Sequence, residues 1–229
     1  MTTPGAGGSY GARRRGVTAT AYWLASDMVV DGSSKLLSWA DRINSHNMGP
    51  QAGTGAPQVT TAAGWKALST LSGIAACNVS AIGNAADGFG VWSLVFRLQI
   101  LVDATYLGWT TSAYGSKHTI QTTGGGGILR CRRFSTTTNA YSNLGVDTYG
   151  AGTFTIGIDY DGANYSAYKN GTSIASGVAG SLSVDAACDR FAFLTGTANY
   201  IGAVKLWVGS NISAAQHASE HTALAAVCP

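Results

Sequence analysis

The chain has 229 residues, of which 45% are hydrophobic and only 11% are charged, and its formal net charge is +3. This length and apolar content are enough to bury a sizeable core in one domain. The small net charge gives no reason to expect a nucleic-acid partner. No stretch approaches the ~18 consecutive apolar residues of a membrane-spanning helix, so no membrane association is expected.

The first segment, residues 1–17, is a Gly-rich arm that contains Arg13, Arg14 and Arg15. No apolar run follows its basic residues, so it does not have the pattern of a secretory signal. Adjacent arginines in a Gly-rich arm predict docking onto an acidic surface of a partner protein. We expect one domain, residues 18–229, to follow the arm.

Short strands separated by turn signals follow the arm. The first is expected at 18–23, and residues 45–64, rich in Gly, Pro, Gln and Thr, predict a long loop. The clearest strand is 91–103, because alternate residues from Trp92 to Val102 are apolar and share one face. Further strands are expected at 106–111, 119–122 and 128–134, with a hairpin tip at 124–127 and a wide loop at 135–152.

Residues 154–176 have the pattern of an antiparallel meander. Phe154, Ile156, Ile158 and Tyr160 alternate with Thr155, Gly157 and Asp159, which predicts a strand with one buried face. The sequence Asp161-Gly162-Ala163-Asn164 favours a turn, and a returning strand is expected at 165–169. Asn170-Gly171 then predicts a tight type I′ hairpin turn before a third strand, because both residues tolerate positive φ.

The last segment, 213–227, is predicted to be a short helix. Its Ala-rich composition favours helix, and Ser213 followed by Gln216 matches a capping box. Almost no helical periodicity precedes it, and strands and turns alternate regularly. The sequence therefore predicts an all-β sandwich with a C-terminal helix.

Several of these elements resemble a known family. The stretch Asp159-Tyr160-Asp161-Gly162, the later Tyr168-Lys169-Asn170-Gly171, the strands 191–194 and 200–207, and Ser213-Ala214-Ala215 resemble the C-terminal half of a laminin-G-like, concanavalin A-like jelly roll. Trp39-Ala40-Asp41 resembles an element near the start of such domains. The resemblance implies a two-sheet antiparallel jelly-roll sandwich. It implies a shape rather than an activity, since this fold hosts lectins, glycosidases and structural modules.

The four cysteines, Cys77, Cys131, Cys188 and Cys228, are far apart and include no Cys-x-x-Cys pair. A zinc site is therefore not expected. The cysteines could be buried thiols or form one or two disulfides, and the absence of a secretory pattern favours thiols.

The sequence His217-Ala218-Ser219-Glu220-His221 matches a zinc-peptidase pattern in which two histidines on one helix face hold the metal. Such enzymes need a further carboxylate ligand, and Glu220 is the only glutamate of the chain. A solvated helix face is the preferred interpretation, ahead of a surface metal or a metallopeptidase. We expect no cofactor and no metal, with calcium as an open alternative.

Glycoside hydrolysis needs two carboxyl groups flanking the sugar bond, about 5 to 10 Å apart. Asp159 and Asp161 point the same way along the predicted strand, but Asp161 begins a turn where Asp is favoured for local hydrogen bonding. A turn and a solvated face are preferred over a calcium or sugar contact, or catalysis. We therefore expect a protein that is not an enzyme.

Sugar binding needs aromatic faces and amide or carboxylate groups on loops or strand ends. Each candidate aromatic must be weighed against a place in the core. Arg130, Arg132 and Arg133 form a second basic cluster, interpreted as a solvated strand face. The candidates for glycan binding are Trp109, Tyr114, Tyr141, Tyr149, Asn164 and Tyr200, with Asn143 and Asn199 nearby.

The combined features resemble stand-alone laminin-G-like proteins of tailed-phage virions. That resemblance implies a non-enzymatic virion surface protein, assembled in the host cytoplasm, that decorates or cements the capsid through its arm. It implies the major capsid protein or another virion protein as partner, a homo-oligomer or lattice, and glycans as further ligands. The alternatives are a tail-fibre or receptor-binding adhesin, and a sugar-binding module or glycosidase of the concanavalin A-like class.

Overall fold

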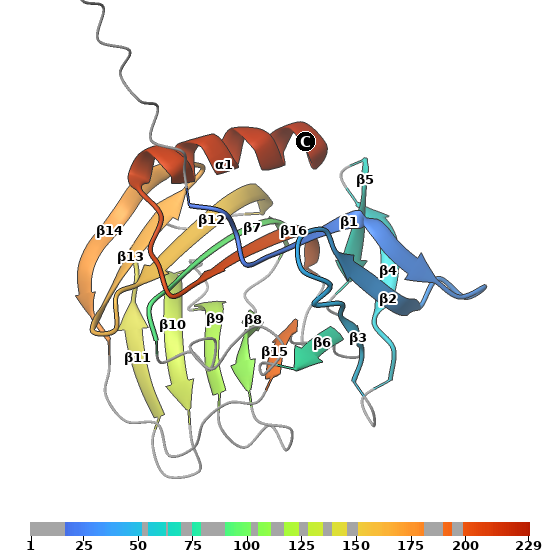
Figure 1. Ribbon diagram of the computed structural model, residues 1–229, viewed down its shortest axis with the longest axis horizontal. Helices are drawn as coiled ribbons and strands as arrows, with labels where there is room; N and C mark the ends of the chain where they lie inside the picture. Colours follow the sequence, from blue (N-terminus) through green and yellow to red (C-terminus); the bar gives the residue numbers. More distant parts are fainter. Residues whose placement is uncertain are drawn as a thin grey trace, which may run out of the picture.

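The computed structural model describes residues 17–51, 55–62, 64–69, 75–78, 90–101, 105–110, 117–123, 128–134, 139–145, 151–180, 190–193 and 199–229. These residues form two antiparallel sheets packed face to face, and a helix lies over the outer face of the larger sheet (Figure 1). The predicted two-sheet jelly-roll sandwich with a short C-terminal helix is confirmed. Except for Val17, the predicted arm lies outside the described residues, and so do Arg13, Arg14 and Arg15.

The larger sheet has the strand order β14-β13-β12-β7-β16-β1-β2. On one edge β16 pairs with β7, and on the other it pairs first with β5 and then with β1, so the sheet forks at β16. The hairpin partner of β5 is β4. The strands are β1 (Ala21–Val30), β2 (Leu36–Asp41), β4 (Gln58–Ala62), β5 (Trp65–Ser69), β7 (Trp92–Ile100), β12 (Gly152–Tyr160), β13 (Asn164–Lys169), β14 (Thr172–Ala179) and β16 (Tyr200–Val208).

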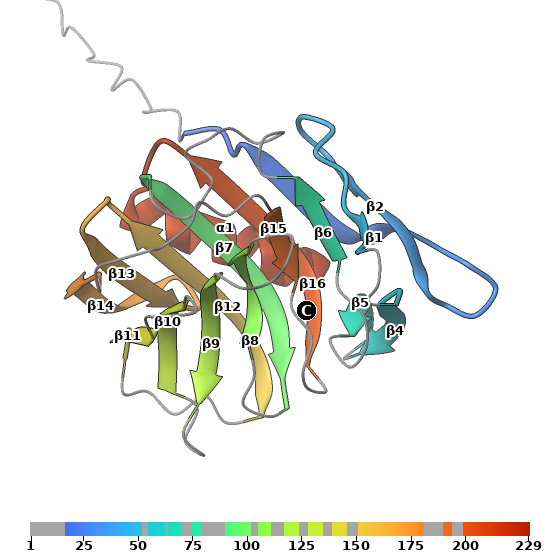
Figure 2. The same ribbon diagram turned by 90° about the horizontal axis from the view of Figure 1, so that it is seen from below.

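The smaller sheet has the order β11-β10-β9-β8-β15-β6-β3 and lies below the larger one in Figure 1 and in front of it in Figure 2. Its strands are β3 (Gly49–Pro50), β6 (Ala75–Asn78), β8 (Thr105–Thr110), β9 (Lys117–Thr123), β10 (Ile128–Phe134), β11 (Asn139–Asn143) and β15 (Arg190–Phe193).

The core lies between the two sheets and is dominated by β7 and β12, which pair in unbroken register from Gly152 opposite Ile100 to Tyr160 opposite Trp92. The predicted apolar faces of both strands lie in it, although Phe154 is only partly buried and Val102 lies outside the described residues. Across the sandwich, the Trp92 ring lies 4.6 Å from that of Trp109 on β8. Period-2 alternation thus identified the inner face of both strands correctly.

The two predicted turns of the meander are confirmed. Asn170 and Gly171 have φ values of 50° and 80°, as a type I′ turn requires. Asp161 Oδ1 accepts hydrogen bonds from the backbone amides of Ala163 and Asn164, at 2.8 and 2.6 Å. Local side-chain bonding of this kind explains why Asp begins the first turn.

The helix α1 (Ala214–Val227) begins after Ser213, whose Oγ accepts a hydrogen bond from Gln216 N at 3.2 Å. The Gln216 side chain does not complete the capping box but bonds the backbone of Val17. The predicted N-cap at Ser213 is therefore confirmed, whereas the predicted bond from the Gln216 side chain back to the Ser213 backbone is wrong. Among the described residues, no helix is long and apolar enough to cross a membrane.

Some expected boundaries are wrong. The first strand begins at Ala21, later than expected, and the predicted loops 45–64 and 135–152 contain β3, β4 and β11. These are short strands with few apolar residues, and backbone pairing with a neighbouring strand defines them. The expected hairpin tip 124–127 lies outside the described residues. Cys131 and Cys228 are buried and form no disulfide, as expected for thiols.

Candidate functional site

The outer face of β7 and β12 carries a buried polar network under α1. Asp159 lies on β12, and its Oδ1 accepts a hydrogen bond from Ser93 Oγ at 2.5 Å. His217 Nε2 donates to the same carboxylate, at 2.9 Å from Oδ1 and 3.1 Å from Oδ2. Since a carboxylate only accepts, the ring proton of His217 lies on Nε2. Each of the three residues is at most 5% exposed.

Serine, histidine and aspartate meet here, but not in the order of a catalytic triad. In a triad the histidine lies between the serine and the carboxylate, and it accepts the serine proton. Here the carboxylate lies in the middle, so no histidine accepts the proton of Ser93, whose Oγ also accepts from Ile212 N at 3.0 Å. The cluster fastens α1 to the sheet and offers no nucleophile.

The histidine pattern of α1 has a different role from the one expected. His217 is 1% exposed and its ring stacks on Tyr168 with centroids 3.8 Å apart, so the prediction of a solvated face is wrong for this residue. His221 Nδ1 lies 3.0 Å from Thr155 Oγ1 of β12. No group of three potential metal ligands occurs among the described residues. Both histidines contact the sheet because they are four residues apart on one helix face.

The C-terminal end of α1 is also held by the sheet. Arg97 Nε of β7 donates to the carbonyl of Cys228 at 2.9 Å, and Trp65 Nε1 of β5 donates to that of Pro229 at 3.1 Å. Burial raises the pKa of the Cys228 thiol to about 11. A thiol with such a pKa is protonated at neutral pH and is not a nucleophile.

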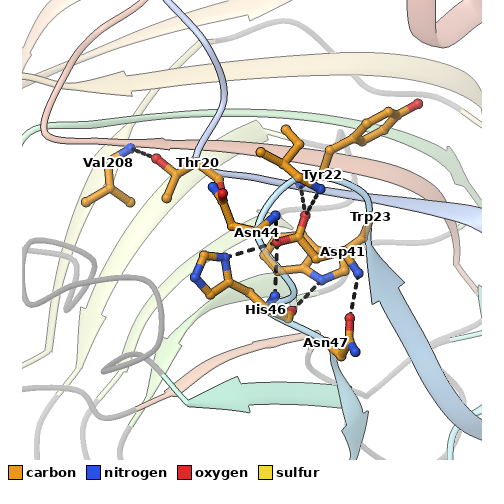
Figure 3. A network of polar contacts seen from close by, with 9 residues as sticks. Thr20, Tyr22, Trp23, Asp41, Asn44, His46, Asn47 and Val208 are labelled. Carbon is orange, nitrogen blue, oxygen red and sulfur yellow. Dashed lines mark hydrogen bonds and ion pairs between the residues drawn. The ribbon is translucent and has the colours of Figure 1, made fainter.

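A second polar centre surrounds Asp41 at the end of β2 (Figure 3). Its carboxylate accepts from the backbone amides of Tyr22, Ile43, Asn44 and His46 at 2.8 to 3.1 Å, and lies 3.0 Å from His46 Nδ1. Burial alone would raise the pKa of Asp41, but these backbone hydrogen bonds hold it below its usual value. With its oxygens occupied, Asp41 positions the chain from Arg42 to Asn47 and is no ligand for a metal.

The structure brings together only part of the predicted glycan-binding set. Trp109 is 0% exposed and packs against Trp92 and Phe191, so it is not available for sugar stacking. Tyr200 is half-buried on β16, away from the sheet edges, and packs against the cluster under the C-terminal end of α1. Nearby, Asn199 is fully buried and accepts from Leu101 N. Tyr114 and Tyr149 lie outside the described residues.

Tyr141 and Asn164 remain, and they lie at the same edge of the sandwich. Ser142, next to Tyr141, donates to the carbonyl of Ala179 on β14 at 2.8 Å, and Ala179 pairs with Asn164. Asn164 is half-buried and belongs to the Asp161 turn, since its Nδ2 lies 3.4 Å from Asp161 Oδ2. Tyr141 is therefore the predicted aromatic that the structure leaves exposed in the described region.

Tyr141 is the centre of what we term the β10–β11 face, formed by the outward side chains of Arg130, Tyr141 and Asn143. Register places these three on the same side of the smaller sheet, because Arg130 is opposite Asn143. The Arg130 guanidinium lies 4.2 Å from the centroid of the Tyr141 ring, and Tyr141 is 40% exposed. Further along this side of the sheet, Thr119 and Gln121 are buried. An aromatic ring, a guanidinium and an amide thus meet at an exposed edge.

No protein-family model and no curated protein matches the sequence of this chain. Solved structures share its fold. Domain 4 of AbnA, an extracellular GH43 arabinanase from Geobacillus stearothermophilus in complex with arabinotriose, is 12% identical with a TM-score of 0.61. The match covers 90% of this chain and 98% of that domain.

Two further structures illustrate the range of proteins with this fold. Trypanosoma rangeli sialidase in complex with sialic acid is 11% identical with a TM-score of 0.59, over 90% of this chain and 33% of the sialidase. The binding domain of botulinum neurotoxin DC in complex with rat synaptotagmin II is 14% identical with a TM-score of 0.61, over 83% of this chain and 52% of that one. At such identities, the likeness establishes a shared β-sandwich fold.

Proposed function

We propose that this chain is a non-enzymatic protein that binds glycans through the β10–β11 face. The observation that carries the proposal is the exposed ring of Tyr141, backed by the Arg130 guanidinium and next to Asn143. Aromatic rings pack on the apolar side of a pyranose, while guanidinium and amide groups bond its hydroxyls. The shared fold with an arabinanase domain in complex with arabinotriose supports it.

The described carboxylates support binding without catalysis. A glycosidase needs two carboxyl groups that reach the same sugar bond from opposite sides. Asp159 is buried under α1, and the Asp41 carboxylate is occupied by backbone amides. The others described are engaged as follows: Asp27 with Arg42, Asp31 and Asp161 in tight turns, and Glu220 with Lys205.

A glycan array with the full chain, followed by calorimetry on the best ligand, tests this function. Tyr141→Ala should weaken binding at least about tenfold, which corresponds to ~1.4 kcal/mol, while Tyr141→Phe should retain most of the affinity because it keeps the ring. Leu37→Ala removes an exposed apolar side chain from β2 and serves as the matched control. An array without any bound glycan, or equal affinity in Tyr141→Ala and the parent, would contradict the proposal.

A location on the virion surface, with the N-terminal arm as the docking element, is the second part of the proposal. The Val17 carbonyl accepts from Gln216 Nε2 and Trp207 Nε1, each at 2.8 Å, and its amide donates to Gln216 Oε1 at 3.2 Å. The described chain therefore begins beside α1, outside the larger sheet, whereas β10 and β11 belong to the other sheet (Figure 1). This arrangement suits a protein that docks by its arm and displays glycan-binding residues on the opposite side.

The partner for this role is the major capsid protein or another virion protein with an acidic surface, in a lattice of copies of this chain. Deletion of residues 1–16 should abolish incorporation into particles, and replacing Arg13, Arg14 and Arg15 together by alanine should reduce it strongly. Occupancy is measured by quantitative mass spectrometry of purified particles. Unchanged occupancy would contradict arm docking, and co-purification with tails instead of heads would favour the adhesin alternative.

A further inference from the structure

The fork in the larger sheet creates a groove on the side away from the β10–β11 face residues. From β16 outward, the β1–β2 hairpin and the β4–β5 hairpin diverge, because β1 pairs with Leu206 to Ala203 and β5 with Ile201 and Tyr200. Between them lies a groove of about 590 Å³ lined by residues of both hairpins. This volume is in the range of small-molecule sites, roughly 300 to 1,000 Å³.

Backbone hydrogen bonds hold the two walls of the groove together. Leu36 N donates to Pro57 O and Val59 N donates to Ser34 O, each at 2.8 Å. The tip of the β1–β2 hairpin is fixed in turn by Asp31, whose Oδ1 accepts from Ser33 N and Lys35 N. A ligand would therefore meet a groove that is already formed, which lowers the entropic cost of binding.

The groove offers one positive charge among neutral polar groups. Lys66 Nζ donates to the Met28 carbonyl at 2.6 Å, which leaves two of its three protons for other acceptors. No described carboxylate lies within ion-pair distance of Lys66. The pKa of Asp27 is lowered chiefly by its hydrogen bond with Arg42 and in small part by the charge of Lys66, and Asp31 accepts the turn amides.

The remaining lining is suited to a polyhydroxylated ligand. Thr61 lies directly opposite Lys66 on the same face of the β4–β5 hairpin, and the hydroxyls of Ser34 and Thr61 make no hydrogen bond to protein within the described residues. Val30 is half-buried and provides an apolar patch. Hydroxyls next to a small apolar surface match the groups of a pyranose.

We propose that this groove binds the residue of a sugar acid, with the sugar carboxylate at Lys66 and its hydroxyls at Ser34 and Thr61. A single ammonium balances a monoanion, whereas a doubly charged phosphate would leave one charge uncompensated. Phosphate is also best bound by the forked guanidinium of an arginine, and no arginine lines the groove. The site is independent of the β10–β11 face, so either can fail without the other.

Glucuronate and glucose are the probes, because they differ at one carboxylate. Isothermal calorimetry on the full chain should give a saturable glucuronate site with a Kd of about 1 mM or below. Glucose should bind at least about tenfold more weakly. An increase in ionic strength should weaken the binding of glucuronate and not that of glucose. A glucuronate-containing oligosaccharide tested in parallel shows whether the groove accepts the acid within a chain.

Lys66→Met keeps the length of the side chain and removes its charge, and should raise the Kd for glucuronate at least about tenfold. Lys169→Met, on β13, is the matched control and should leave the Kd unchanged. Because Lys66 also bonds Met28, Thr61→Val serves as a second variant that leaves this bond intact and should raise the Kd several-fold. Tyr141→Ala should leave the Kd unchanged, which separates this site from the β10–β11 face.

Three results would overturn the proposal. The first is the absence of saturable glucuronate binding, and the second is equal affinity for glucose. The third is an unchanged Kd in both Lys66→Met and Thr61→Val, each verified as folded by circular dichroism. Loss of neutral-glycan binding in Tyr141→Ala together with intact glucuronate binding would support both sites separately.

Discussion

Gly157 of β12 makes room for His217. A Cβ added at Gly157 would lie 2.4 Å from His217 Nδ1, so the ring or the whole helix would have to move. Gly157→Ala should therefore lower the free energy of unfolding by about 2 to 3 kcal/mol. In a His217→Ala background the space is vacant, and the same substitution should cost at least about 1 kcal/mol less. Urea denaturation of the four proteins measures this coupling.

Gly32→Ala is the control for this cycle. It lies in the β1–β2 turn with no heavy atom within 4 Å of the added Cβ. Its effect should be within about 0.5 kcal/mol in both backgrounds. Strictly additive costs of Gly157→Ala and His217→Ala would contradict the contact.

His221 should make the stability of the sandwich depend on pH. Burial, and then the nearby Arg97 guanidinium, lower the pKa of His221 in the folded protein. As the pH falls through about 6.5, the unfolded chain therefore takes up a proton before the folded chain does. Stability should decrease on acidification below about pH 6.5. Unfolding midpoints between about pH 7.5 and 5 should fall less in His221→Gln, and equal slopes in both proteins would contradict this role.

The role of His217 could not be predicted from the sequence. The face of α1 that contacts the sheet carries His217 and His221 as well as Leu224, so hydrophobic periodicity does not distinguish it from a solvated face. Similarly, Asp159 alternates with apolar residues as a surface residue would. Its burial results from the docking of a helix 58 residues later in the chain. A contact between two polar residues so far apart in the chain forms only in the tertiary structure, and the sequence around each residue does not indicate it.

At the scale of elements, Asp41 organises the end of β2 and the connection that follows. Asp41→Asn replaces one acceptor oxygen by an NH2 group that faces backbone donors, so the free energy of unfolding should decrease by about 2 to 3 kcal/mol. Because the hydrogen bonds of the loop hold the pKa of Asp41 low, its contribution should disappear as the pH falls below about 3.8 in the parent protein. Chemical denaturation at neutral and acidic pH measures both effects.

Asp31→Asn is the matched control for Asp41. Asp31 also accepts two backbone amides, but in an exposed turn where water can replace them. Its substitution should cost clearly less than that of Asp41. Equal costs would show that burial of the Asp41 carboxylate does not matter.

Elements with strong local chemistry could be predicted, and elements defined by pairing could not. Alternation placed Ile156 and Ile158 in the core, and Asn170-Gly171 specified its turn. By contrast, β4 and β11 have mostly polar residues, and only register with β5 and β10 makes them strands. The prediction of Trp109 as a glycan-binding residue failed for the same reason. It was expected near a strand end, but it packs in the centre of the sandwich.

At the scale of the molecule, the two outer faces of the sandwich differ. The helix covers β7, β12 and β14 on one side, whereas the other sheet carries Tyr141 and Arg130 at its edge (Figure 1). The sequence predicted the sandwich and the helix, but not which sheet the helix covers. The sequence could therefore supply a list of candidate aromatic residues but not their exposure. The structure excludes Trp109 from that list because it is buried.

The position of β16 has a consequence for biosynthesis. This strand, Tyr200–Val208, joins β7 to β1 and to β5, so the larger sheet stays in three parts until the ribosome has released residue 208. Contacts across nearly the whole chain, such as Trp207 Nε1 to Val17 O, then close the sandwich in a slow, non-local step. Nascent chains stalled before residue 200 should remain sensitive to protease, while chains released in full should become resistant.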